Sequence, residues 1–233
     1  MDRLQPAYVL LKRPYSNSSL LLELFTPEFG RVAVIAKGAR GKAGRYGGYL
    51  QPFIPLEVSW RGRGEVKSLL KAEAKGISVI ARGRKLYCGF YLNELLTRLM
   101  QREDPHAELF THYALTLNAL SSAEQLEPLL RRFEVALLES IGFGMQLEIT
   151  ADGEPVMKNL RYHCAVEHAP VIAASVDATG FSGETLLALA GELSFSEKTI
   201  TESRHLMRQV ITHYLGGKPL KSRELFRSLY GGR

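Results

Sequence analysis

The spacing of apolar residues changes once along this chain, and the change restricts the folds that the chain can adopt. Apolar residues alternate in short runs before residue 76, as in residues 31–37, but recur every three or four residues from about Arg84 onward, as in residues 92–99. A period of two predicts strands with one buried face, and a period of 3.6 predicts amphipathic helices. The chain is therefore predicted to be a multi-domain α+β protein, with a β module at 1–80 and a helical domain at 81–233.

The β module is expected to form a small closed or nearly closed barrel. Turn residues such as Pro27, Gly30 and the glycines of "RGRG" separate the apolar runs. An open sheet of this size would leave long bare edges, which favours closure. The pattern also leaves an SH3-like barrel open. Five strands are predicted, at residues 7–13, 19–25, 31–37, 56–60 and 66–72.

The helical domain is expected to contain an irregular insertion at 145–181, where periodicity disappears and Gly, Pro, Asp and His accumulate. Residues of the types that cap helices predict where the helices begin. These starts are expected at Asp104, Ser182 and Ser196. For the third helix two starts remain open, a capping box at Ser122 and Gln125 or a start nearer Glu127, because Pro128 is unfavourable inside a helix.

Positive charge is concentrated in the β module. Residues 31–85 hold 13 lysines and arginines against 3 acidic residues, whereas residues 86–215 hold 9 against 17 and residues 216–233 hold 5 against 1. Attraction of phosphates depends on local positive density rather than on the net charge of +6. A polyanion is therefore expected to bind the β module.

The loop at 36–53 gathers cations and glycines and is the first candidate for that contact. Glycines allow backbone N–H groups to approach an anion closely, and Tyr46 is a candidate for base stacking. The alternative is a solvated hairpin connection, in which glycine gives freedom and charge gives solubility. Phe53 and Trp60 are expected in the core. The predicted DNA-binding residues are Lys37, Arg40, Lys42, Arg45, Tyr46, Arg61, Arg63 and Lys67.

Enzyme and metal sites find little support in the sequence. No phosphate-binding P-loop, nucleophile elbow or HExxH motif occurs, so no ATPase or hydrolase activity is expected. His163, Cys164 and His168 offer three metal ligands where a structural zinc site uses four. An active site around Asp152, Glu154, His163 and Cys164 is the remaining enzyme hypothesis. We expect no catalytic residue, metal or cofactor.

The cellular location is expected to be the cytoplasm. The two cysteines, Cys88 and Cys164, lie far apart, and the first residues do not have the pattern of a secretory signal. No apolar run approaches the roughly 18 residues of a membrane span, so a membrane protein is not expected.

Arg131 and Arg132 are adjacent on the third predicted helix and have two interpretations. Either pairs with Glu127, Glu134 or Glu139 on the same helix, or one of them binds the acidic tail or terminal carboxylate of a partner protein.

The chain resembles the RecO family of bacterial recombination mediators and is most similar to the RecO of the enterobacteria and their relatives. The resemblance covers nearly the whole chain. It lies in the segments "AYVLLKRPYSNSSLLLELFTPEFGRVAVIAKGAR", "LQPF", "GRGEVKSL", "YLNELL", "LRRFEVALLESIGFG" and "YLGGKPLKSRELF".

The resemblance implies an N-terminal OB-fold followed by a helical domain. It also implies a mediator of DNA repair and recombination that binds single- and double-stranded DNA and anneals complementary strands. With RecR it would load RecA onto DNA coated by the single-strand-binding protein SSB, whose acidic tail it would engage through Arg131 or Arg132. Such a protein would be associated with the nucleoid. Some members carry a four-cysteine zinc site in the region that matches 145–181, where this chain has only Cys164.

Two questions remain open from the sequence. An RNA-binding or ribosome-associated OB-fold module would show the same charge pattern. The cations near the C-terminus extend the DNA-binding track only if the terminal helix folds back near the barrel. These cations are Lys218, Lys221, Arg223 and Arg227.

Overall fold

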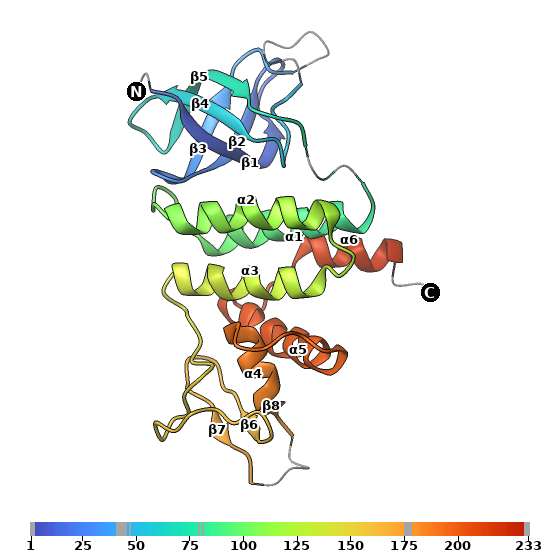
Figure 1. Cartoon of the computed structure of the whole chain (residues 1–233). Coiled ribbons are helices and arrows are strands. Elements are labelled where there is room, and N and C mark those ends of the chain that lie inside the picture. Colours follow the sequence, from blue (N-terminus) through green and yellow to red (C-terminus); the bar gives the residue numbers. More distant parts are fainter. Residues whose placement is uncertain are drawn as a thin grey trace. The chain divides into compact units, whose positions relative to one another are not determined.

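The computed structural model describes residues 3–40, 46, 48–78, 80, 82–174 and 179–230. It divides into two compact units (Figure 1). The first comprises Met1–Ser122 together with Leu220–Arg233, and the second comprises Ala123–Pro219. The first unit therefore combines the N-terminal strands with helices from the middle and from the end of the chain.

Five strands of the first unit close into a barrel, as the alternating pattern predicts. Their order around the barrel is β1-β2-β3-β5-β4, with β3 and β5 parallel and β1 pairing with β4 to complete the ring. The barrel is OB-like, which confirms the predicted fold class. The strands are β1 (Gln5–Pro14), β2 (Leu20–Thr26), β3 (Gly30–Ala36), β4 (Leu56–Arg61) and β5 (Val66–Ala74).

The inward side chains of the strands fill the barrel. In β3 the alternate residues Val32, Val34 and Ala36 are buried, and Trp60 of β4 packs edge-to-face against Phe29, with 5.4 Å between the ring centres. Burying an aliphatic or aromatic side chain of this size contributes about 1.5–3 kcal/mol. The core position expected for Trp60 is confirmed, and Phe53 is buried as well.

Helices α1 (Gly83–Leu99) and α2 (Ala107–Ser122) lie against the barrel in the same unit (Figure 1). Strand β1 has an irregularity at Leu10, and the side-chain amide of Asn93 on α1 donates to the Leu10 carbonyl oxygen at 2.9 Å. The side-chain oxygen Oδ1 of Asn93 in turn accepts a hydrogen bond from the Tyr113 hydroxyl of α2 at 2.5 Å. These buried bonds join both helices to β1.

The prediction that Asp104 begins a helix is wrong, because α2 begins at Ala107. The segment before α2 instead follows the barrel: the Glu103 amide donates to the Arg31 carbonyl oxygen at 3.0 Å. Gly30 has a φ of +57°, and a Cβ there would lie 1.8 Å from the Asp104 carbonyl oxygen. The close packing on Gly30 holds Asp104 away from the start of the helix.

Among its described residues, the second unit contains three helices, α3 (Glu127–Ser140), α4 (Gly183–Ala190) and α5 (Glu197–Tyr214). Of the two starts left open for the third helix, the structure has the one at Glu127. Ser182 and Ser196 are also confirmed as caps, since their hydroxyls accept hydrogen bonds from the Thr185 and Thr199 amides.

The insertion at 145–181 is less irregular than predicted, because it contributes to a three-stranded sheet of order β7-β6-β8. Its strands are β6 (Arg161–His163), β7 (Val171–Ile172) and β8 (Phe181–Ser182). Strands of two or three residues are too short for an alternating pattern to be recognised. The predicted helical domain therefore contains a small β-sheet in addition to its helices and irregular segments.

No helix in the described part of the chain has the length and apolarity of a membrane span.

Candidate nucleic-acid interface

The predicted barrel cations form two groups beyond opposite ends of β3 rather than one track. Arg40 follows the end of β3, whereas Arg63 lies in the turn before β5. Strand β5 runs parallel to β3, and its first residue Val66 pairs with Ala33 in the middle of β3, so the turn lies toward the start of β3. Seven residues of strand at about 3.3 Å each separate the two ends by roughly 20 Å. We call these groups the Arg40 loop (residues 37–40) and the Arg63 turn (residues 61–64).

The Arg40 loop is fastened to the turn between β1 and β2. The Arg40 amide donates to the Ser18 carbonyl oxygen at 3.1 Å, and its guanidinium donates to the Ser16 carbonyl oxygen. Lys37 is exposed beside it in sequence. Lys42 and Arg45, also predicted to bind DNA, lie outside the described residues.

Two residues that the sequence analysis did not predict to bind DNA, Arg13 and Tyr15, lie just before Ser16 in the chain. Both are exposed, and 60% of Tyr15 is accessible to solvent. The β1–β2 loop is one of the two loops with which OB-folds bind oligonucleotides, and an exposed ring is available for base stacking. The signal for these residues in the sequence is the tripeptide "RPY" at residues 13–15, which places a cation and an aromatic ring at the end of a strand.

Tyr46, the predicted stacking residue, faces the opposite way. Only 4% of it is exposed, and it belongs to the barrel core beside Tyr49, with 6.3 Å between the ring centres. A ring buried in the core does not present a face to a base. Tyr15 therefore replaces Tyr46 as the candidate for base stacking.

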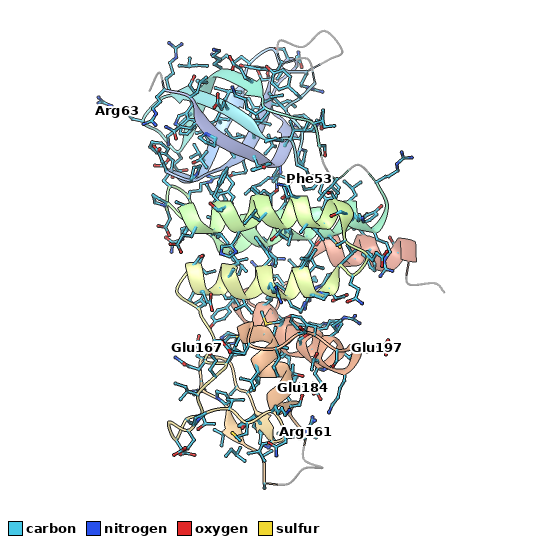
Figure 2. All side chains as sticks on the ribbon, in the orientation of Figure 1. Phe53, Arg63, Arg161, Glu167, Glu184 and Glu197 are labelled. Carbon is cyan, nitrogen blue, oxygen red and sulfur yellow. The ribbon has the colours of Figure 1, made fainter. Side chains whose placement is uncertain are left out.

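The Arg63 turn projects into solvent from the other loop that OB-folds use, between β4 and β5. Arg61 and Arg63 are exposed, and Figure 2 shows Arg63 pointing outward from the barrel. Gly62 adopts a φ of +119°, which favours glycine and lets the turn reverse tightly. No ion pair of either arginine occurs among the described residues, so both guanidiniums are available to phosphates.

Lys67 is less available than predicted. Its ammonium forms an ion pair with Glu103, and only 12% of its side chain is exposed. A phosphate would have to replace the Glu103 carboxylate to bind there. Lys71 is likewise paired with Glu73 of the same strand, and Lys75 is paired with Glu57 of β4.

The outer surface of β2 and β3, a common OB-fold binding face, is covered by the α1–α2 connection. Arg31 donates to the Thr97 carbonyl oxygen at 2.6 Å, and the buried Glu23 carboxylate pairs with Arg102. Burial lowers the pKa of Arg31, and the adjacent Glu23 acts in the opposite direction. These contacts occupy the side chains of Glu23 and Arg31 on this face, whereas Arg40 and Arg63 in the barrel loops are exposed.

In the second unit the two adjacent arginines have different environments. Arg131 is buried, and its guanidinium lies 2.7 Å from the carboxylate of Glu134, which is fully buried, and 3.9 Å from that of Glu127. Arg132 is exposed. A partner's acidic tail can reach Arg132, whereas Arg131 is engaged inside the unit, so we correct the candidate pair to Arg132 alone.

Two observations concern the residues considered for an enzyme or metal site. Burial raises the pKa of the Cys164 thiol to about 12, so the thiol is protonated and unreactive at neutral pH. Among the described residues no group of three or more His, Cys, Asp or Glu side chains is arranged to hold a metal ion.

Comparison with known proteins matches both parts of the chain to one family. A model described as "Recombination protein O N terminal" matches residues 1–77, and one described as "Recombination protein O C terminal" matches residues 81–224. Similar proteins named DNA repair protein RecO occur in Methylococcus capsulatus (49% identity, covering 97% of this chain and 93% of the relative), Halorhodospira halophila (45%, 97% and 97%) and Alkalilimnicola ehrlichii (46%, 97% and 91%).

Proposed function

The chain belongs to the RecO family of DNA repair proteins, and from this premise we propose that it binds single- and double-stranded DNA and anneals complementary strands. The observation that carries the proposal is the pair of exposed basic groups at the two ends of an OB-like barrel, one of them beside the exposed ring of Tyr15. The family supports DNA rather than RNA as the polyanion.

The proposed mechanism uses position and charge without a chemical step. Two DNA strands repel each other through their phosphates, and cationic side chains that neutralise phosphates release counterions and reduce this repulsion. A strand reaching from the Arg40 loop to the Arg63 turn would cover roughly 20 Å, which is about six phosphates of one strand at the 3.4 Å spacing along a duplex axis. Phosphate contacts of this kind hold any sequence, as annealing requires.

The proposed partners follow from the same role. We infer that the protein acts with RecR to load RecA onto DNA coated by SSB, and that exposed Arg132 receives the acidic SSB tail by charge complementarity. This role requires no enzymatic activity, metal or cofactor. A DNA-repair role would associate the protein with the nucleoid in the cytoplasm.

The test is charge reversal at the barrel loops. In the double variant Arg61→Glu and Arg63→Glu we expect the affinity for oligo(dT) to fall by roughly tenfold for each lost charged contact. The slope of log K against log salt should decrease by about 0.7 for each lost single-strand phosphate contact. Fluorescence anisotropy at several salt concentrations measures both quantities.

The matched control reverses two exposed cations of the second unit, Lys158→Glu and Lys198→Glu, which change the net charge equally. This control should retain the wild-type affinity and salt slope. If both double variants lost affinity for oligo(dT) equally, overall charge would explain the effect. If the Arg61/Arg63 variant kept the wild-type affinity, the Arg63 turn would not be part of the DNA-binding site.

A further inference from the structure

The C-terminal helix α6 (Lys221–Tyr230) folds back onto α1 in the first unit. The Glu94 carboxylate of α1 accepts hydrogen bonds from the Lys221 amide at 2.9 Å, the Ser222 amide at 2.8 Å and the Ser222 hydroxyl at 2.6 Å. Leu220 and Ser222 are buried by this contact. The start of α6 is therefore fixed on α1, although more than 120 residues separate them in sequence.

Arginines and aromatic rings alternate along the contact between the two helices. The Arg223 guanidinium lies 5.4 Å from the centre of the Tyr91 ring and donates to the Tyr91 hydroxyl at 3.2 Å. The Arg84 guanidinium lies 5.7 Å from the centre of the Phe226 ring. Stacking on a ring fixes a guanidinium while leaving N–H groups at its edge able to donate to phosphate oxygens.

The charge of this surface is strongly positive. Arg82, Arg84 and Lys221 are exposed, and Lys85 and Arg223 are half-buried. In the described parts of these helices, Glu224 is acidic and exposed. The other acidic residue, Glu94, caps α6 with its carboxylate. We name this set of five cations the α1–α6 surface. None of them takes part in an ion pair within the described part of the chain, in contrast to Lys67, Lys71 and Lys75 of the barrel.

The α1–α6 surface is distinct from the barrel loops. Helix α1 contacts both β1 and α6. The cations of the α1–α6 surface lie at or just before the start of these two helices, whereas the Arg40 loop and the Arg63 turn follow β3 and precede β5. Unpaired cations grouped with aromatic rings have the chemistry that recognises single-stranded nucleic acid.

We propose that the α1–α6 surface binds the phosphate backbone of a second DNA strand while the barrel loops hold the first. The proposal rests on the proposed annealing function and deepens it, because one compact unit then presents two strands to each other. It also assigns a role to the C-terminal helix, whose participation the sequence left conditional.

The test measures simultaneous binding of two strands that cannot pair. One oligo(dT) carries a fluorescence donor and another carries an acceptor, and the full-length protein is titrated with both. The wild type should bring the two dyes together and show energy transfer. The double variant Arg82→Glu and Lys221→Glu should lose most of the transfer and anneal complementary strands more slowly, while its affinity for the first oligo(dT) changes by less than about twofold, as expected for independent sites.

The variants are chosen so that folding is preserved. The side chains of Arg82 and Lys221 are exposed, and the hydrogen bond from residue 221 to Glu94 uses the backbone amide, which the substitution keeps. Thermal melting should match the wild type. Glu224→Lys should increase energy transfer, and the second-unit variant with Lys158→Glu and Lys198→Glu should leave it unchanged.

The outcomes separate this inference from the function on which it rests. Unchanged transfer and annealing in the Arg82/Lys221 variant would overturn the inference and leave DNA binding by the barrel intact. If this variant lost its affinity for the first oligo(dT) to the same extent, the inference would also be overturned, because the two surfaces would then form a single DNA-binding site. A wild-type protein that binds no oligo(dT) would instead overturn the proposed function itself.

Discussion

The two units of the molecule differ in what their cations do. The first unit holds 22 lysines and arginines against 11 acidic residues, and the second holds 8 against 13. In the first, Arg61 and Arg63 extend from a turn into solvent, whereas in the second Arg131, Arg161 and Arg204 are engaged with acidic neighbours. A cation attracts an external polyanion only when internal carboxylates do not already neutralise it, so the environment of each arginine decides its role.

The largest expected effect separates the two adjacent arginines of α3. Arg131→Ala leaves the fully buried Glu134 carboxylate without its closest cation and should destabilise the second unit by about 3–5 kcal/mol. Arg132→Ala should change stability by less than about 0.5 kcal/mol, because its side chain is exposed. Urea unfolding followed by far-UV circular dichroism measures both. Comparable stability of the two variants would contradict the contrast between buried and exposed cations.

A second effect concerns the carboxylate of Glu202 on α5. It accepts hydrogen bonds from the Ser182 amide and from the Ser182 and Thr185 hydroxyls, at 2.7–2.8 Å, and pairs with Arg161. Burial alone would raise the pKa of Glu202, but these hydrogen bonds outweigh burial and lower the pKa to about 2, from an ordinary value of 4.5. The charged form thus stabilises the fold.

The pH dependence of this contribution follows from the direction of the shift. A lowered pKa in the folded state gives stability that is complete above about pH 4.5 and is lost as the pH falls toward 2. Glu202→Gln should therefore be less stable than the wild type at pH 6, and the difference should shrink between pH 4.5 and pH 2. Urea midpoints at a series of pH values provide the measurement. A difference that stays constant over this range would show that the carboxylate charge is not responsible.

The third effect returns to the barrel loops. Tyr15→Ala should weaken single-stranded DNA binding by about 1–3 kcal/mol, the range for loss of one stacking aromatic residue. Tyr15→Phe should retain the affinity, since the ring alone is needed. Tyr49→Phe is a matched control at a tyrosine whose hydroxyl donates to the Ala72 carbonyl oxygen inside the barrel. Anisotropy with oligo(dT) tests all three, and full affinity of Tyr15→Ala would exclude stacking at this position.

The barrel could be predicted from the sequence because each strand is five or more residues long and has one buried face. The small sheet of the second unit could not, because strands such as Val171–Ile172 are too short to show a period. Asp104 was misassigned because capping was inferred from local sequence, whereas Gly30, far away in the chain, determines where that segment lies.

The residues of the candidate site also differ in whether local sequence predicts their environment. Arg61 and Arg63 are exposed because a glycine-rich turn cannot bury them, and this was predictable from sequence. The pairing of Lys67 with Glu103 and the burial of Tyr46 depend on contacts between distant segments, for which an isolated sequence carries no signal. Arg131 and Arg132 differ only in the side of the helix that they occupy.

The smallest expected effect tests whether internal pairing limits DNA binding in the first unit as well. Glu103→Gln removes the negative charge that holds Lys67 and should raise the affinity for oligo(dT) at low salt by up to about fivefold, equivalent to about 1 kcal/mol for an exposed ion pair. Glu28→Gln removes the same charge from an exposed residue with no ion pair among the described residues, and it measures the general electrostatic gain. In a Lys67→Gln background the specific gain from Glu103→Gln should disappear, because there is no longer an ammonium to release. Equal gains at Glu103 and Glu28 would mean that Lys67 does not reach the phosphates even when its partner is neutral.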